Sequence, residues 1–261
     1  MVISIVNFTE TLADEEVLTA IRAINRQIAE DFQPYWSMGA TLRLEGPTSE
    51  LDRQAPQELR GDAIIYLWDK EADVPNAIGY HAANNLGLPY GFVFTEIAHR
   101  VGEEWSVTLS HEALELVGDA EVNILAAGPH PEHPERAVYF WYEMCDAVQA
   151  ESYKIDGVDV SNFVLPLYFT VDKEEGSRND FLGRLHNGKA LPSFGVNPGG
   201  YVGFFDPELG KDDVVTADAA AEKRLQIKSS LRDIRPDVRL RRSTRYRNVN
   251  TAVIKKKKAA A

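Results

Sequence analysis

Residues 2–117 alternate between hydrophobic patterns typical of strands and patterns typical of helices. The segment 2–6 (VISIV) is short and mostly apolar, as in a buried strand. Residues 14–31 then place Val17, Ile21, Ile24 and Ile28 three and four residues apart, which predicts an amphipathic helix. Further extended segments are expected at 40–44, 62–68 and 88–98, and a second helix at 105–117. This order predicts an α+β fold in which a long helix packs on a mixed, twisted sheet.

The pattern loosens after Gly118, a residue that suits the end of the second helix. We therefore expect an N-terminal subdomain at 1–121 and an irregular, β-rich C-terminal subdomain at 122–218. A hairpin in the second part is predicted to turn at Asp156–Gly157. A basic tail follows at 219–261.

The charge of the chain divides at this tail. The formal net charge is −12, yet the segment 222–261 has 14 Lys and Arg against 3 Asp and Glu. Residues 1–221 therefore carry −23 and the tail +11. Opposite charges predict that the tail either folds onto its own acidic body or binds an acidic protein or a nucleic acid. The arginines expected to make such contacts are Arg239, Arg241, Arg242, Arg245 and Arg247.

Targeting signals and cysteine content narrow the class of protein. The start, MVISIVNFTET, lacks the basic segment and cleavage site of a signal peptide, and no apolar run approaches the ~20 residues of a membrane-spanning helix. We expect no membrane association and a cytoplasmic or virion-associated protein. The single cysteine, Cys145, excludes an internal disulfide and a cysteine-rich zinc cage. A metal site would have to use histidine and carboxylates.

The second helical segment carries such residues. His111 and Glu115 stand four residues apart, about 40° around a helix axis, so both side chains can reach one ion. Glu112 projects in another direction, where it can act as a general base toward a metal-bound water. This pattern is typical of metal-assisted peptide hydrolysis.

The segment SHEALELVG resembles the zinc-binding helix His-Glu-x-x-His-x-x-Gly of the zincin metallopeptidases, with Glu115 in the position of the second histidine. The preceding order of elements is similar to the amino-terminal half of the metzincins, in which an edge strand lines the substrate cleft. The resemblance places that edge strand at residues 87–95, with Gly91, Phe92 and Val93 against the substrate. It covers roughly residues 2–121, and beyond it Met144 is the counterpart of the family's methionine-containing turn.

The third metal ligand has several candidates. Asp119 is the first, because it follows His111 by eight residues and stays near the same helix face. Glu121 occupies the position of the third ligand after the glycine in the resembled motif. Glu143 and Asp146 offer an arrangement similar to that of the gluzincins, in which a later carboxylate completes the site. A set with one histidine and several carboxylates suits zinc and also other divalent metals.

Two functions follow from these features. The first is a zinc-dependent metallopeptidase that acts on a peptide or protein substrate, with Glu112 as the base and His111, Glu115 and Asp119 as ligands. The second is a catalytically inactive zincin-like structural protein of a larger assembly, such as a virus particle, docked by its basic tail. His130 and His133, held between prolines in GPHPEHPE, are expected to belong to a loop and not to a metal site.

Overall fold

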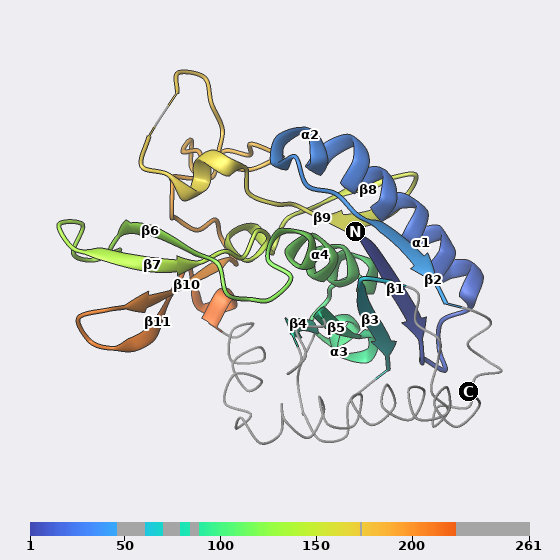
Figure 1. Ribbon diagram of the computed structural model, residues 1–261. Coiled ribbons are helices and arrows are strands. Elements are labelled where there is room, and N and C mark those ends of the chain that lie inside the picture. The colour runs from blue at the N-terminus through green and yellow to red at the C-terminus, as the bar shows by residue number, and fades with distance from the viewer. Residues whose placement is uncertain (46–60, 70–78, 84–88, 173, 223–261) are drawn as a thin grey trace.

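The computed structural model describes residues 1–45, 61–69, 79–83, 89–172 and 174–222 (Figure 1). The basic tail contacts expected from Arg239 to Arg247 lie outside these residues. Within them the chain is a mixed α+β structure with several sheets and few helices, so the α+β prediction is confirmed.

A five-stranded sheet forms the N-terminal half. Its strands, in spatial order, are β2 (Thr41–Leu44), β1 (Val2–Asn7), β3 (Ala63–Trp68), β5 (Pro89–Phe94) and β4 (Gly79–Ala83). The first four run parallel, and β4 pairs antiparallel with β5. Strand β4 is therefore an edge of the sheet among the described strands.

The expectation that residues 87–95 form the edge strand is wrong. Within β5, Gly91 pairs with Ile65 of β3 on one side and with His81 of β4 on the other. Phe92 and Val93 are fully buried. A nearly continuous apolar run such as PYGFVF is typical of a central strand that is covered on both faces, because neither set of its alternating side chains meets water.

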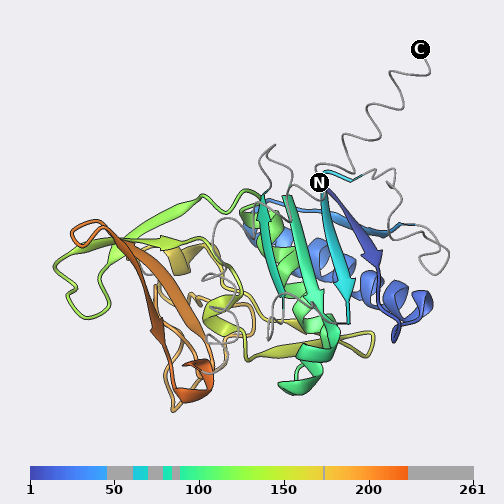
Figure 2. The ribbon, with the colours of Figure 1, turned by 90° about the horizontal axis from the view of Figure 1, so that it is seen from below.

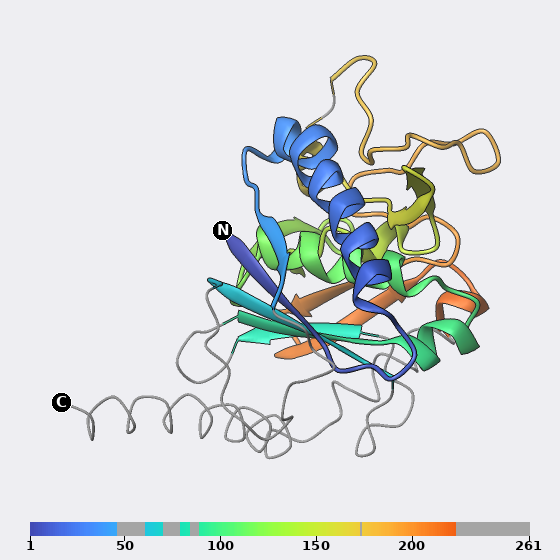
Figure 3. The ribbon, with the colours of Figure 1, turned by 90° about the vertical axis from the view of Figure 1, so that its right-hand side faces the viewer.

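The first helix begins at Asp14, as its sequence pattern predicts. Helix α1 (Asp14–Arg26) continues through a π-helical segment, Gln27–Phe32, into the short helix α2 (Gln33–Trp36). Its first turn carries three acidic residues, which favour the positive end of the helix dipole. The apolar face of α1 packs on the same side of the sheet as helix α4 (Trp105–Gly118) (Figures 2 and 3).

Helix α4 lies at the centre of the molecule. It covers β4 and β5 on one side and contacts the hairpin of β8 (Ser152–Ile155) and β9 (Val158–Ser161) on another. The hairpin turns at Asp156–Gly157, as predicted. Helix α3 (Thr95–Arg100) precedes α4, so residues 95–98 are helical where the sequence predicts an extended chain.

A second sheet is formed by the C-terminal part. Its antiparallel strands follow the order β11 (Lys211–Thr216), β10 (Tyr201–Asp206), β7 (Ala137–Trp141) and β6 (Leu125–Pro129). In Figure 1 this sheet projects to one side of α4, while the first sheet lies on the other. The segment between β7 and β8, residues 142–151, returns to α4 and carries a single 3₁₀ turn, Asp146–Val148.

The main hydrophobic core joins both halves of the chain. One continuous cluster includes Ile5 of β1, Ile24 of α1, Leu114 of α4, Phe163 after the hairpin and Phe204 of β10. A second cluster lies on the opposite face of the first sheet, where Tyr66, Phe92 and Phe94 form a stacked aromatic layer. Within the described residues, no helix has the length and apolar character needed to cross a bilayer.

Candidate metal centre

Helix α4 carries polar residues in a buried environment. It is covered by the sheet and the hairpin, and every residue from Ser106 to Gly118 is buried. His111, Glu112 and Glu115 are between 2 and 4% exposed. Ionisable groups that are removed from water to this extent are costly unless they find partners, so their surroundings decide what they do.

His111 and Glu115 meet as their four-residue spacing predicts. Nε2 of His111 lies 3.1 Å from Oε1 of Glu115 and 3.3 Å from Oδ1 of Asp146. The sulfur of Cys145 belongs to the same group, because one ligand atom each from His111, Glu115 and Cys145 lie within 4.8 Å of one another. Two elements thus converge on one point: α4 and the segment that follows β7.

A second histidine enters the site from the sheet edge. Nδ1 of His81, on β4, lies 3.2 Å from Oε2 of Glu112 and 3.5 Å from Oε2 of Glu115. Its other ring nitrogen, Nε2, lies 3.7 Å from Oε2 of Glu143. His81, Glu115 and Glu143 form a second group whose ligand atoms are within 4.8 Å of one another. Glu115 belongs to both groups.

The carboxylates around His81 control its protonation. Burial alone would lower the pKa of this histidine, because it disfavours the charged ring. The negative charge of Glu143, the hydrogen bond to Glu112 and the charge of Glu115 outweigh burial and raise the pKa of His81 to about 9. In the absence of a metal ion, His81 is therefore a cation at neutral pH.

Close packing brings these elements together. A methyl group at Gly79 of β4 would lie 2.7 Å from the Cγ2 of Thr108 and 2.9 Å from Oε1 of Glu112, so glycine permits the approach of β4 to α4. At the other end of α4, Gly118 lies against the side chain of Met144, which is completely buried. Met144 separates Glu143 from Cys145 and thus anchors the segment that supplies the later side chains.

A buried polar network fixes α4 to its neighbours. The hydroxyl of Ser110 donates to Oε1 of Gln27 at 2.6 Å and accepts the N–H of Ser161 at 3.0 Å. Nε2 of Gln27 donates to the carbonyl of Ser161 at 2.7 Å. Each of these three residues is fully buried. The network joins the π-helical segment, α4 and β9, so His111 has a rigid support one residue away.

The structure separates the proposed third ligands. Asp119 is buried, but its Oδ2 accepts the N–H of Ile124 at 2.7 Å and closes the loop after α4. Glu121 is exposed and accepts a hydrogen bond from Asn123. Neither belongs to the two ligand groups found among the described residues. Glu143, in contrast, belongs to the second group and faces His81. Asp146 faces His111 but belongs to neither group.

Sequence reasoning did not identify His81 or Cys145 as members of the site. His81 stands in a polar segment that is typical of a turn, and only the antiparallel pairing of β4 brings it beside α4. A single cysteine without a histidine near it in the sequence gives no sign of a ligand role, and Cys145 is completely buried. Its backbone N–H donates to Oε1 of Glu115 at 3.2 Å, which holds its sulfur near the site.

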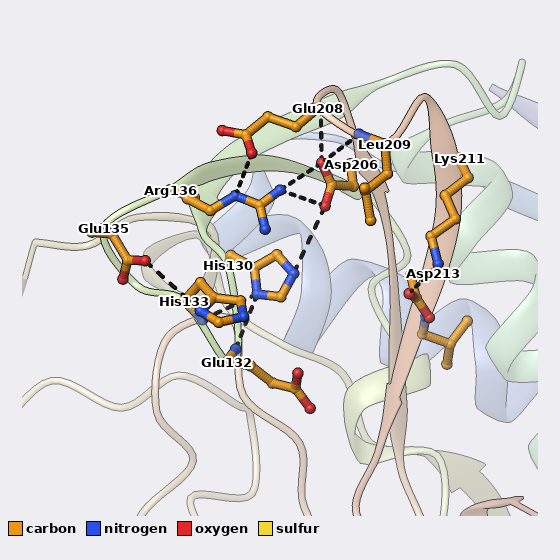
Figure 4. A network of polar contacts seen from close by, with 11 residues as sticks. His130, Glu132, His133, Glu135, Arg136, Asp206, Glu208, Leu209, Lys211 and Asp213 are labelled. Atoms are coloured by element: carbon orange, nitrogen blue, oxygen red, sulfur yellow. Dashed lines mark hydrogen bonds and ion pairs between the residues drawn. The ribbon is translucent and has the colours of Figure 1, made fainter.

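The loop with His130 and His133 forms a separate polar network (Figure 4). Nδ1 of His130 accepts the backbone N–H groups of Glu132 and His133, both at 3.1 Å. Arg136 donates to both carboxylate oxygens of Asp206, at 3.0 and 2.8 Å. Burial would raise the pKa of Asp206, but the N–H groups of Leu209 and Glu208 and the Arg136 guanidinium outweigh it and lower that pKa. These contacts tie the β6–β7 loop to the β10–β11 hairpin.

The atoms around His111 suit a metal ion. Ligand atoms bound at about 2.0–2.2 Å to a tetrahedral zinc ion lie about 3.3–3.6 Å apart. The distance from Nε2 of His111 to Oε1 of Glu115, 3.1 Å, is close to this value, and Cys145 completes a group whose ligand atoms all lie within 4.8 Å of one another. Imidazole, thiolate and carboxylate are also the ligand types that zinc accepts. Comparison of the chain with protein-family models, with curated proteins and with solved structures found no match.

Proposed function

We propose that the protein is a metal-dependent hydrolase, and specifically a zincin-like peptidase. The observation that carries the proposal is the convergence of His111, Glu115 and Cys145, whose ligand atoms all lie within 4.8 Å of one another in a buried site, with Glu112 next to His111 in the sequence of helix α4. These three residues would hold the ion, and Oδ1 of Asp146 lies 3.3 Å from Nε2 of His111, beside them. Cys145 replaces Asp119 in this assignment, because the carboxylate of Asp119 already closes the loop after α4.

Zinc is the ion that this donor set favours. A cysteine sulfur and a histidine nitrogen are softer donors than the all-oxygen shells that magnesium and calcium prefer. The surrounding carboxylates make the set harder than a typical zinc site, so manganese and cobalt are reasonable substitutes in experiments.

Glu112 is the proposed base. A divalent ion at this site would supply Lewis acidity to a substrate carbonyl or a water molecule. The carboxylate of Glu112 would take the proton of the attacking water. His81 holds that carboxylate through the contact of its Nδ1 with Oε2 of Glu112, at 3.2 Å, so the base has a fixed orientation.

The edge strand β4 is the proposed substrate platform. It pairs only with β5 among the described strands, and we propose that the other side of its backbone pairs with an extended peptide. His81 projects from this strand toward Glu112, which places the edge beside the proposed base. This position replaces the assignment of Gly91, Phe92 and Val93, whose strand is paired on both sides.

The proposal is tested by combining metal analysis with a cleavage assay. The zinc content of the purified protein is measured beside His111→Gln, and hydrolysis of a fluorescence-quenched peptide library is followed for the wild type and Glu112→Gln. We expect His111→Gln to lose the zinc ion that His111 holds, so its zinc content should fall below that of the wild type. Glu112→Gln should keep its zinc and lose activity by a factor of about 10²–10⁴.

Glu132→Gln is the matched control, because Glu132 is an exposed carboxylate on the β6–β7 loop. It should leave both zinc content and cleavage unchanged. A protein without zinc in any variant, or a cleavage activity that survives Glu112→Gln, would rule out the proposed mechanism.

A second candidate is a zincin-like structural protein of a larger assembly. The charge of the site favours it: four carboxylates surround two histidines, and anionic ligands weaken an ion as a Lewis acid. In this reading the metal stabilises the fold, and the basic segment 223–261 docks the acidic body to an anionic partner. Zinc binding without hydrolysis of any peptide, together with loss of the partner after removal of residues 223–261, would favour it over the peptidase.

A further inference from the structure

The two carboxylate oxygens of Glu115 face two different histidines. Oε1 lies 3.1 Å from Nε2 of His111, and Oε2 lies 3.5 Å from Nδ1 of His81. The histidines come from opposite sides of the site, one from α4 itself and the other from β4. A carboxylate in this position is placed to bridge two neighbouring centres, because each oxygen can serve a separate ligand group.

The second group is complete enough to hold an ion of its own. His81, Glu115 and Glu143 each offer a ligand atom within 4.8 Å of the others, and none of these residues takes part in the contacts between His111 and Asp146. Only Glu115 is shared with the His111 group. The side chain of His81 is 4% exposed. Its Nε2 is buried without a hydrogen-bond partner among the described residues, although it faces Glu143 at 3.7 Å.

The negative charge of the site also favours a second ion. Four carboxylates, those of Glu112, Glu115, Glu143 and Asp146, converge on the two histidines. Negative charge gathered in a buried environment is costly unless cations compensate it, and two divalent ions would balance the four carboxylates.

We propose that the site binds two divalent cations, with Glu115 as the bridging carboxylate. The first ion is the one held by His111, Glu115 and Cys145, and the second is held by His81, Glu115 and Glu143. This inference rests on the proposed metal centre and extends it. A pair of ions would act together on a substrate, one orienting it and the other stabilising the charge that develops.

Native mass spectrometry of the full chain, titrated with Zn²⁺, tests the proposal by counting bound ions. The wild type should bind two zinc ions. Glu143→Gln and His81→Gln should each bind one, because each removes a ligand of the second ion only. His111→Gln should also bind one, the ion held by His81 and Glu143. Glu132→Gln is the matched Glu-to-Gln control and should still bind two.

The outcomes separate this inference from the proposed function. A single zinc ion that is lost in His111→Gln and kept in His81→Gln and Glu143→Gln overturns the second ion and leaves the first centre intact. Two ions that persist in both His81→Gln and Glu143→Gln place the second ion elsewhere and also overturn the inference. A single ion lost in all three variants means one mononuclear centre around Glu115. No zinc in the wild type overturns both proposals. Far-ultraviolet circular dichroism establishes that each variant is folded.

Discussion

Among single residues, His81 has the most unusual environment. It is buried, yet the carboxylates of Glu143, Glu112 and Glu115 raise its pKa to about 9 against the pull of burial. A histidine whose pKa is higher in the folded chain than in the unfolded chain binds its proton more tightly when folded, so protonation stabilises the fold. The metal-free protein therefore relies on a charged histidine where the metal-loaded protein would rely on an ion.

We predict a pH-dependent loss of stability in the metal-free protein that depends on His81. The contribution of the protonated His81 to the free energy of unfolding is fully present below pH 6.5, the pKa of histidine in the unfolded chain. It is lost as the pH rises toward about 9, the pKa of His81 in the folded chain. A difference of this size corresponds to roughly 3 kcal/mol in the free energy of unfolding. Urea unfolding with a chelator, from pH 6 to pH 10, should show the stability of wild type falling relative to His81→Gln. A constant difference between the two proteins would contradict this assignment.

The sequence predicts part of the site because that part is local. His111 and Glu115 lie one helical turn apart, so helix geometry alone brings them together. Asp119 satisfies the same geometry and yet turns to Ile124, because the helix ends at Gly118. His81 and Asp146 reach His111 and its neighbours only through tertiary packing, which no spacing in the sequence reports.

At the scale of elements, α4 is held by buried hydrogen bonds as well as by apolar packing. The hydroxyl of Ser110 satisfies both Gln27 of the π-helical segment and the backbone of Ser161 in β9. Removal of the Ser110 hydroxyl would leave its buried partners without a hydrogen bond. A buried polar group without a partner lowers the free energy of unfolding by more than the hydrogen bond itself contributes.

We predict that Ser110→Ala lowers the free energy of unfolding by about 1–3 kcal/mol. The variant deprives Gln27 and the N–H of Ser161 of a partner. Ser177→Ala is the control, because Ser177 is exposed and its hydroxyl donates to the carbonyl of Glu174 in its own turn. Chemical denaturation compares the two. Equal stabilities of Ser110→Ala and the wild type would show that water replaces the hydroxyl.

The contact of β4 with α4 depends on Gly79. A methyl group there would lie 2.7 Å from Thr108, 2.9 Å from Glu112 and 3.0 Å from the carbonyl of Phe92. We predict that Gly79→Ala costs about 1–3 kcal/mol of stability, because the strand or Glu112 must move. The zinc affinity measured by titration calorimetry should fall as well, since His81 moves with β4.

Gly157→Ala is the control for Gly79→Ala, because it adds backbone strain at a glycine without moving β4 against α4. Gly157 has φ +85° and no atoms within 4 Å of an added methyl group, so alanine would be strained without a clash. This control should lose about 1 kcal/mol and keep its zinc affinity. If Gly79→Ala also kept full affinity, the approach of β4 would not matter to the metal site.

The elements themselves were predictable where one pattern dominates. The helix from Asp14 and the hairpin at Asp156–Gly157 follow from periodicity and turn chemistry, and both are observed. The order of strands was not, because periodicity reports which residues are buried and not which strand lies beside which. The edge was therefore assigned to β5 and belongs to β4.

At the scale of the whole molecule, the candidate metal centre joins three parts of the chain. Ligand atoms come from β4, from α4 and from the segment after β7, and the core that surrounds them extends from β1 to β10. An ion bound only by the folded chain stabilises every contact between these parts at once. The ligands must lose their protons to bind it, so protons compete with the metal.

We predict that Zn²⁺ at one hundred times its Kd adds about 2.7 kcal/mol to the free energy of unfolding. For a chain of this size the gain corresponds to a Tm increase of about 5–10 °C. Differential scanning fluorimetry at pH 6 and pH 8 should show a larger increase at pH 8, because fewer protons compete for His81 and His111. The metal-free protein changes in the opposite direction over the same range, as His81 begins to lose its proton. If zinc raises the Tm of the double variant His81→Gln/His111→Gln as much as that of the wild type, zinc binds outside this centre. If the rise in Tm disappears in the double variant, the ion holds the two halves of the molecule together.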